Sequence, residues 1–279
     1  MNILITGGSG TFGRAFTGRL LQEGVGRICI YSRGEYAQHL MRKQFNDDPR
    51  IRYFIGDVRD RPRLYRAMEG VDVVVSAAAL KRIEVCAYNV MECVETNIRG
   101  TENVVNAAID AKVKKAILLN TDKAVLPTTT YGLSKAIAER IFLGANYYAG
   151  ANRTKFSSCL YGNIAGSTGS VIPLFRKMLQ NSDTVTVTDQ NATRFWMYPS
   201  EACDLVLRAI KEMNGGEVFI PDLPAYRVGD LVEAMGAKMK IIGLAENEKL
   251  HEEMRPGETS DKARRMSVDE IRKALRAID

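Results

Sequence analysis

The sequence is poor in the residues that most often build metal sites and nucleophilic triads. Only two histidines, His39 and His251, occur in 279 residues, so a histidine-rich metal site or a Ser-His-Asp triad has little material. The five cysteines show neither C-x-x-C nor zinc-type spacing, which favours reduced thiols in a core over metal ligands or disulfides. We therefore expect a site without a metal.

Long apolar runs are also missing. The most apolar stretch, residues 73–80, is far too short to span a membrane. The N-terminal MNILITGG lacks the basic and apolar regions of a secretory signal, so a cytoplasmic location is expected. The net charge of +6 comes from scattered basic residues with acidic ones among them, which disfavours nucleic-acid binding but is compatible with an anionic substrate.

Short β-branched runs alternate with amphipathic helical stretches through the first 163 residues. Strands that are apolar almost throughout and separated by helices predict an α/β fold, a doubly wound parallel sheet covered on both faces. No internal repeat or low-complexity linker is present. The expected strands are 2–6, 27–32, 51–56, 71–76, 115–120 and 155–162, and the expected helices are 12–23, 60–69, 91–112 and 132–148.

After residue 163 the alternation loosens, although 217–221 is predicted to be a late strand of the same sheet. We predict a dinucleotide-binding domain over 1–163, to which 191–221 returns. Residues 164–190 and 222–279 would form a small α-rich substrate lobe.

The first expected strand leads into TGGSGTFGRAF, a G-x-x-G-x-x-G pattern at Gly7, Gly10 and Gly13. Glycine here permits a tight turn, lets backbone N–H groups approach a pyrophosphate and lets the helix pack on the strand. Because the pattern lies between a strand and a helix, it predicts a dinucleotide-binding loop, with Thr11 and Phe12 beside the cofactor, rather than a simple turn.

The cofactor preference depends on the residues that follow the second and third strands. An NAD-preferring site usually has an acid after the second strand, whereas this chain has Ser32 and Arg33. An arginine suits the extra 2′-phosphate of NADP, so we expect NADP rather than NAD. The alternative is that Arg33 is an ordinary surface charge. Asp57, in GDVRD, would hold the adenine amino group, beside Val58.

Residues 118–135, LLNTDKAVLPTTTYGLSK, contain a Tyr-x-x-x-Lys pair. Tyr131 and Lys135 are four apart and would share a helix face. A cation beside a phenol lowers the tyrosine pKa from about 10, so Tyr131 could take an alcohol proton while hydride leaves the same carbon for nicotinamide. Thr121, at the preceding strand end, would orient the alcohol. The alternative is an exposed helical pair without function.

These motifs make the chain resemble the extended short-chain dehydrogenase/reductases that modify nucleotide sugars, with their Rossmann-type sheet. More narrowly, it is similar to the inverting UDP-N-acetylglucosamine 4,6-dehydratases of bacterial glycan biosynthesis. The most specific element is Thr-Asp-Lys-Ala at 121–124, because related retaining dehydratases carry Asp-Glu at Asp122 and Lys123. The resemblance extends to about residue 252 and includes YFIGDVRD, AAALK, YNVMECVETNIRGTENV, YGNIAGSTGSVIPLF, TRFW and EKLHE.

The resemblance implies a mechanism for loss of water across C5 and C6 of a UDP-sugar. Tyr131 would be the base for the C4 hydroxyl, with its pKa lowered by Lys135. Lys123, as a neutral amine, would take the C5 proton, and a protonated Asp122 would assist loss of the 6-hydroxyl. Hydride stored on NADPH would return to C6. Alternatively, Asp122 and Lys123 form a surface ion pair.

The resemblance also implies contacts to both ligands and a homo-oligomeric assembly. The implied cofactor residues are Ala77, Ala78, Lys81 and Asn97, together with Tyr131 and Lys135. The implied UDP-sugar residues are Lys81, Asn163, Val171, Arg194 and Glu248, with Arg194 on the diphosphate and Glu248 on the uridine ribose.

Several positions depart from the family pattern. Ala245 and Thr168 stand where relatives have arginines, and Leu160 and Ser76 replace a further arginine and a histidine. Loss of two anion contacts leaves the exact nucleotide sugar open, and Arg255 could supply a substitute charge.

Two other functions stay open at this level. A UDP-sugar 4-epimerase or reductase would share the glycine loop and the Tyr-Lys pair without needing Asp122 and Lys123. A non-enzymatic NADP-binding regulator on the same fold would be expected to have lost Tyr131 or Lys135, which are both present.

Overall fold

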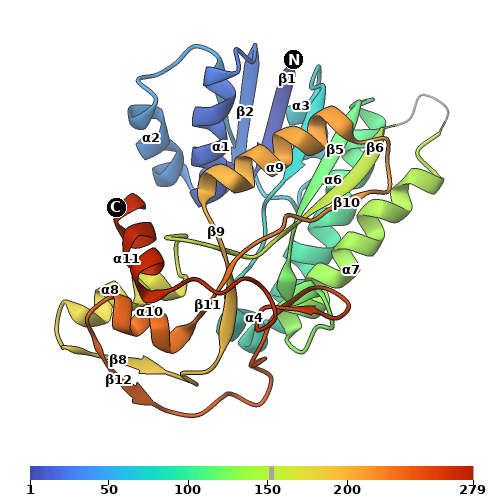
Figure 1. The fold of residues 1–279 in the computed structure, drawn as a ribbon. Coiled ribbons are helices and arrows are strands. Elements are labelled where there is room, and N and C mark those ends of the chain that lie inside the picture. Colours follow the sequence, from blue (N-terminus) through green and yellow to red (C-terminus); the bar gives the residue numbers. More distant parts are fainter. Residues whose placement is uncertain (151–153, 279) are drawn as a thin grey trace.

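The computed structural model describes residues 1–150 and 154–278; residue 279, the end of the expected lobe, lies outside the described residues. A seven-stranded sheet forms its centre, and every neighbouring pair of strands in it is parallel (Figure 1). The strand order is β10-β6-β5-β4-β1-β2-β3. The strands are β1 (Asn2–Thr6), β2 (Arg27–Ser32), β3 (Ile51–Ile55), β4 (Val73–Ser76), β5 (Lys115–Thr121), β6 (Lys155–Tyr161) and β10 (Val218–Phe219).

Helices cover both faces of this sheet, which confirms the doubly wound prediction. On one face α1 (Thr11–Gln22), α2 (Glu35–Gln44) and α9 (Pro199–Glu212) pack on Ile3 and Ile5. On the other, α3 (Arg61–Met68), α6 (Gly100–Asp110) and α7 (Thr130–Gly144) share a core with Leu4 and Val74. Because successive strand residues face opposite sides, burial on both faces requires nearly continuous apolar strands.

Two helical predictions need correction. The expected helix 91–112 is instead a series of short segments: α4 (Ile83–Tyr88), α5 (Val90–Cys93), a π-helical stretch η1 (Val94–Arg99) and α6. A π-helical turn rotates the residues after it relative to an ideal α-helix, and such turns are frequent near functional sites. Helix α2 was not anticipated, because it is largely polar and only Gln38 and Met41 of its ten residues are buried.

The remaining elements form a smaller lobe beside the sheet, at the lower left of Figure 1. Its core gathers Trp196, Tyr226, Leu231 and Ile271. Besides helices the lobe has short strands in 222–278 that the sequence did not signal. Its elements are β7 (Asn163–Ile164), α8 (Val171–Leu179), β8 (Thr184–Val187), β9 (Thr193–Met197), β11 (Ala225–Arg227), α10 (Val228–Ala234), β12 (Lys238–Ile241), β13 (Glu253–Arg255), β14 (Glu258–Thr259) and α11 (Val268–Ala277).

Residues 191–221 take part in both regions. β10 is an edge strand of the large sheet and α9 packs against its core, whereas β9 lies in a small sheet between β11 and β7. The domain boundaries stay a prediction.

The parallel topology decides where function can reside. The carboxyl ends of parallel strands meet at one edge of the sheet, so the segments after β1, β2, β3, β4 and β5 lie near one another there. Within 1–150 and 154–278, no helix is both long and apolar enough to cross a membrane, and no group of His, Cys, Asp and Glu side chains is placed to hold a metal ion.

Candidate active site

The glycine loop after β1 has the close contacts that its sequence predicted. Gly7 adopts a φ of 65°, and a Cβ there would lie 2.9 Å from the backbone of Ala78. A Cβ on Gly13 would lie 2.1 Å from the carbonyl oxygen of Gly8, so α1 can pack on the loop only if glycine occupies position 13. The loop ends at Gly10, which caps α1. Side chains at Gly7 and Gly13 would therefore displace the loop whose backbone N–H groups a pyrophosphate could approach.

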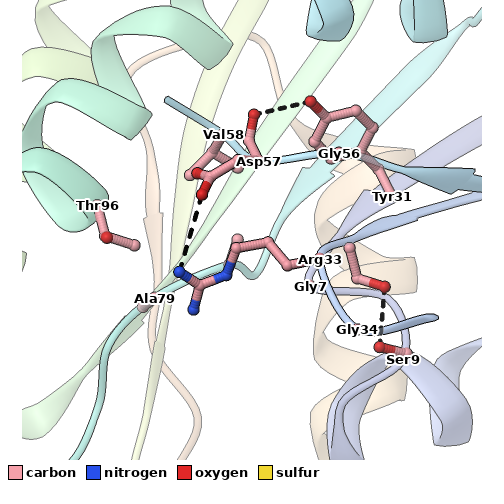
Figure 2. A pocket seen from close by; sticks show the side chains of 12 residues that line it. Gly7, Ser9, Tyr31, Arg33, Gly34, Gly56, Asp57, Val58, Ala79 and Thr96 are labelled. Atoms are coloured by element: carbon pink, nitrogen blue, oxygen red, sulfur yellow. Dashed lines mark hydrogen bonds and ion pairs between the residues drawn. The ribbon is translucent and has the colours of Figure 1, made fainter. Parts of the chain in front are cut away.

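A cavity of about 220 Å³ lies beside this loop (Figure 2). Figure 2 shows Arg33 projecting between the glycine loop and Asp57. Six of the predicted cofactor residues line the cavity, and six lining residues were not anticipated. The predicted ones are Gly7, Ser32, Arg33, Asp57, Val58 and Ala78, and the others are Ser9, Tyr31, Gly34, Gly56, Ala79 and Thr96. This donor set fits the adenosine end of a dinucleotide.

Asp57 carries the negative charge of the cavity. Burial raises its pKa, but ion pairs with Arg59 and Arg33 more than offset that and leave the pKa below its ordinary value. The nearest nitrogen of Arg59 lies 2.8 Å from Oδ2 of Asp57, and that of Arg33 lies 3.8 Å away. The side chain of Arg33 is 54% exposed, so its bond to Asp57 is weak and the guanidinium can turn to a ligand.

The other predicted cofactor residues do not line this cavity. Thr11 bonds the hydroxyl of Thr168 in the loop before α8, at 3.1 Å, and Phe12 stacks on Phe16 in the core. Ala77 donates its backbone N–H to Thr6. Lys81 is exposed on the loop after β4. Thr11 thus joins the start of α1 to the loop before α8, Phe12 packs in the core, and their contacts with a cofactor stay predictions.

Asn97 holds the active-site elements together. Its side chain is buried and bonds both backbone groups of Leu80, accepting at 2.8 Å and donating at 2.9 Å. It also donates to the hydroxyl of Ser134 on α7, at 2.9 Å. Asn97 thus ties the loop after β4 to the helix that carries Tyr131 and Lys135.

Asp122 and Lys123 begin the short helix η2 (Asp122–Ala124), directly after β5. Helix α7 follows, started by the side chain of Thr129, which accepts from the N–H of Gly132. A Cβ on Gly132 would lie only 2.3 Å from the carbonyl oxygen of Lys123. Gly132 is therefore required for α7 to approach η2, a role that the sequence interpretation missed although glycine inside a helical pattern was visible.

Asp122 is fully buried, so the alternative of a surface ion pair is wrong. Its Oδ1 accepts from the hydroxyl of Thr121 and from Nζ of Lys123, both at 3.0 Å. Oδ2 has no hydrogen-bond partner among the described residues. Burial raises the pKa of Asp122, Lys123 lowers it and Glu252 raises it again, with a net increase. This is the direction that a general acid needs.

Lys123 departs from expectation. Burial does lower its pKa, but the charges of Asp122 and Glu252 outweigh burial and place the pKa above its ordinary value. Nζ lies 3.3 Å from Oε1 of Glu252. The predicted neutral amine is therefore not the state of the free protein, because a second carboxylate that the sequence did not reveal lies beside it.

Tyr131 and Lys135 are both buried, so they are not an exposed helical pair. Burial raises the pKa of Tyr131 to about 12, against the lowering effects of Lys123 and of a hydrogen bond with Thr121. Lys135 does not supply the expected lowering: its Nζ donates to the carbonyl oxygen of Leu119 at 2.7 Å, and burial lowers its own pKa to about 8. The predicted lowering of the Tyr131 pKa by Lys135 is therefore not found in this structure.

Of the predicted substrate residues, Arg194 reaches this cluster from the lobe, 4.0 Å from Glu252. Arg194 on β9 lies 3.0 Å from Glu248 and is largely buried. Asn163 lies on β7, which pairs with β9, and its side-chain oxygen is buried without a partner in the described chain. Val171 is the first residue of α8. Arg255 is exposed and pairs with Glu258, away from Arg194.

Glu252 is the functional candidate that sequence reasoning missed. It ends the EKLHE stretch that supplied Glu248, but nothing in its local spacing shows which side chain it would meet. Only the fold brings it within 3.3 Å of Lys123 and 4.0 Å of Arg194.

The chain is similar to known proteins over most of its length. A family model described as "Polysaccharide biosynthesis protein" matches residues 3–274. An inverting UDP-N-acetylglucosamine 4,6-dehydratase from Campylobacter jejuni is 45% identical over 257 residues, 91% of this chain and 77% of the relative. A UDP-glucose 4-epimerase from Rickettsia rickettsii is 38% identical over 271 residues, 94% and 79% of the two chains.

The fold has solved counterparts. The X-ray structure of Pen from Bacillus thuringiensis superposes with a TM-score of 0.93 at 37% identity, covering 99% of this chain and 98% of that one. Several structures of the same fold at 16–21% identity are complexes with NAD. From the family match and the identity over nine-tenths of its length, this chain belongs to the polysaccharide biosynthesis protein family, alongside the inverting UDP-N-acetylglucosamine 4,6-dehydratases.

Proposed function

We propose that the protein is an NADP-dependent UDP-N-acetylglucosamine 4,6-dehydratase that inverts C5 and makes a UDP-4-keto-6-deoxy sugar for bacterial glycan or sugar-metabolite biosynthesis. The observation that carries the proposal is the buried Asp122–Lys123 pair beside Tyr131. An epimerase needs the tyrosine. It has no elimination step, so it has no use for a buried acid beside a lysine. The name of the Campylobacter relative supports the same reaction.

The first half of the reaction removes the proton of the C4 hydroxyl and a hydride from C4 itself. A bound nicotinamide dinucleotide supplies the hydride acceptor and later the donor. Tyr131 would accept the hydroxyl proton, Thr121 would orient the alcohol, and Lys135 would bind near the cofactor ribose. The raised pKa of Tyr131 means that the phenol is neutral in the free protein, so ligand charge must assist its ionisation.

The second half is elimination. A C4 ketone makes the C5 proton acidic; Lys123 takes that proton, and the 6-hydroxyl leaves as water with the proton of Asp122. Oδ2 of Asp122, which lacks a partner within the described chain, is the atom that can donate. Because Lys123 is held as an ammonium in the free protein, it must first release one proton to solvent, which its 21% exposed side chain can reach, before it can act as a base.

The nicotinamide cofactor finds its adenosine site in the cavity of Figure 2. We propose NADP because Arg33 is half-exposed at the position of the 2′-phosphate, with Ser32 before it. NAD is the alternative, supported by the ionised Asp57 in the same cavity and by the NAD complexes that share the fold. In either case Asp57 and Val58 would face the adenine.

Arg194 is the proposed diphosphate contact, and Glu248 would bind the uridine ribose. Their mutual ion pair at 3.0 Å would open when the substrate binds. Asn163, Val171 and Lys81 complete the proposed UDP-sugar set. Thr168 and Ala245 add no charge to this set.

A cytoplasmic location and a homo-oligomer are further proposals. Exposed apolar side chains on α4, α5 and α7 support the second of them, since another copy could cover them. They are Ile83, Tyr88, Met91, Leu133 and Ile137.

The experiment is to incubate the purified protein with UDP-N-acetylglucosamine and NADP, and separately NAD, and to follow the product by mass spectrometry and NMR. Loss of water, a C4 ketone and a C6 methyl group support the proposal. A mass-neutral product would show 4-epimerisation, the reaction named for the Rickettsia relative. A product two hydrogens heavier would show a reductase, and cofactor binding without any product from UDP-sugars would favour a regulator.

A further inference from the structure

Lys123 lies between two carboxylates from distant parts of the chain. Nζ is 3.0 Å from Oδ1 of Asp122 and 3.3 Å from Oε1 of Glu252. The side chains of Asp122 and Glu252 are 0% and 5% exposed, whereas that of Lys123 is 21% exposed. One ammonium cannot compensate two buried negative charges, so the two carboxylates compete for ionisation.

Their surroundings decide that competition. Glu252 has two further cations nearby, Nε of Arg194 at 4.0 Å and Nζ of Lys249 at 3.8 Å. Among the groups that act on the pKa of Asp122, Lys123 is the one cation, and the hydroxyl of Thr121 adds a hydrogen bond. Accordingly the pKa of Glu252, although raised by burial, is brought below its ordinary value by Lys123, Arg194 and Lys249, while burial leaves that of Asp122 raised.

Glu252 is also fixed in place. Its backbone N–H donates to the hydroxyl of Ser260 at 3.0 Å, and its carbonyl oxygen accepts from the N–H of Ser260 at 2.8 Å. That hydroxyl in turn donates to the carbonyl oxygen of Thr193 on β9, beside Arg194. The carboxylate is therefore anchored to the strand that carries the proposed diphosphate contact.

The remaining titratable groups around the pair do not supply a competing negative charge. Tyr131 of α7 and Tyr226 of β11 have pKa values of about 12, which burial raises, so both are neutral at pH 7. Glu248 pairs with Arg194 rather than Lys123. His251 bonds the hydroxyl of Thr193. Glu252 is thus the anion that acts on both Asp122 and Lys123.

We infer that Glu252 is a positioning residue for the elimination step, fixing the place of Nζ of Lys123 and keeping on Asp122 the proton that the leaving 6-hydroxyl takes. The inference rests on the proposed function and assigns a role to a residue that does not itself touch the reacting atoms. Two carboxylates in different surroundings, one ionised and one protonated, are the usual basis for separate roles in acid–base chemistry.

Glu252→Gln tests this because it removes the charge and keeps the shape. Without the neighbouring anion Asp122 ionises more readily, so its pKa falls and the alkaline limb of the dehydration rate should move to lower pH. At pH 8 we expect kcat to fall roughly ten- to a hundredfold, while reduction of the nicotinamide on adding substrate persists in a single turnover. Glu252→Asp, which keeps the charge, should recover part of the rate.

Glu253→Gln is the matched control. Glu253 is the next residue and is also buried, but its carboxylate accepts from the N–H of Gly257 in the β13–β14 turn. We expect it to alter thermal stability and to leave the alkaline limb in place. Two results would overturn the inference and leave Glu252 a structural role only. Glu252→Gln could behave like Glu253→Gln, or it could raise KM through Arg194 while the alkaline limb of the pH profile of the dehydration rate stays in place.

A second measurement needs no turnover and no soluble Glu252 variant. Isotope-edited infrared spectra of protein labelled with ¹³C-aspartate should show a protonated carboxyl at pH 7 that disappears in Asp122→Asn. Its absence from the wild type would overturn the inference. Wild-type protein that releases no water from any UDP-sugar would overturn the proposed function as well, whereas normal dehydration with an unmoved limb in Glu252→Gln would overturn the inference alone.

Discussion

The two halves of the site contain similar charges in very different surroundings. In the dinucleotide cavity, Arg33 and Arg59 share Asp57 at the surface, where water screens each ion pair. In the cluster of Asp122, Lys123 and Glu252, the carboxylates are almost completely buried, and each charge strongly changes the ionisation of the next. Substitutions in the cluster should therefore have large effects on chemistry, and those in the cavity should have small effects on binding.

The largest effects should come from Tyr131→Phe and Lys123→Ala, which separate the two half-reactions. Tyr131→Phe removes the base for the C4 hydroxyl, so no reduced nicotinamide should appear when substrate is added. Lys123→Ala keeps that base but loses the C5 proton acceptor, so it should form NADPH once and then stall without exchange of the C5 hydrogen with solvent deuterium. Each should lower kcat by about 10²–10⁴-fold, measured by absorbance and NMR.

Tyr147→Phe is a matched control for the tyrosine, because Tyr147 is 95% exposed, and it should retain wild-type activity. If Lys123→Ala dehydrates at a near wild-type rate with solvent exchange intact, Lys123 is not the base. The buried pair would then be structural, and the epimerase or reductase alternative would be preferred.

The contrast also explains what could be predicted from the sequence. Both the sheet and the glycine loop leave a local pattern in the sequence. Apolar strands such as β4 are buried along their whole length, and Gly13 meets Gly8 of its own loop, although Gly7 meets Ala78 after β4. The seven-stranded doubly wound fold and most of the cavity followed from such local patterns.

The buried cluster could be predicted only in part. Asp122 and Lys123 are adjacent, and their motif was visible, but the pKa of Lys123 depends on Glu252, which the fold brings from the far end of the chain. The expected ionisation of Tyr131 by Lys135 failed for a similar reason. Four-residue spacing placed both on α7, yet the Lys135 ammonium is directed to Leu119 on β5.

Lys135→Met tests burial within the catalytic helix. The pKa of Lys135 is lowered to about 8 by burial, against a small opposing effect of Glu139. Between pH 8 and 10.5 the unfolded chain therefore binds more protons than the native protein, so stability should rise with pH in that window. Below pH 8 both states are protonated and the full cost, on the order of 3 kcal/mol, is present.

Lys135→Met should therefore raise the free energy of unfolding by about 1–3 kcal/mol at pH 7, the gain being reduced by loss of the bond to Leu119. In this variant the free energy of unfolding should no longer rise between pH 8 and 10.5, as measured by urea unfolding at several pH values. Lys273→Met, on the exposed face of α11, is the control and should leave the pH dependence unchanged. A wild-type slope in Lys135→Met would mean that Lys135 keeps its ordinary pKa.

Arg194→Ala tests the contact between the cluster and the substrate. A lost hydrogen bond to a charged group costs about 1.5–3 kcal/mol, so KM for the UDP-sugar should rise by roughly ten- to a hundredfold. Cofactor affinity, measured by fluorescence titration, should change little. Arg255→Ala is the matched control, because Arg255 is exposed and pairs with Glu258. A raised KM in Arg255→Ala with an unchanged one in Arg194→Ala would place the diphosphate at Arg255.

The smallest effect is expected in the exposed cavity beside the glycine loop. Arg33→Ala should weaken NADP binding more than NAD binding, by about 1 kcal/mol or roughly fivefold, because the half-exposed guanidinium makes a screened contact to a 2′-phosphate. Arg59→Ala is the control. It removes the closer partner of Asp57 at 2.8 Å, lies outside the cavity lining, and should affect both dinucleotides alike. Titration calorimetry with each dinucleotide measures the difference. Equal weakening of NADP and NAD by Arg33→Ala would show that Arg33 acts through Asp57, as Arg59 does, and that NAD is the cofactor to test first.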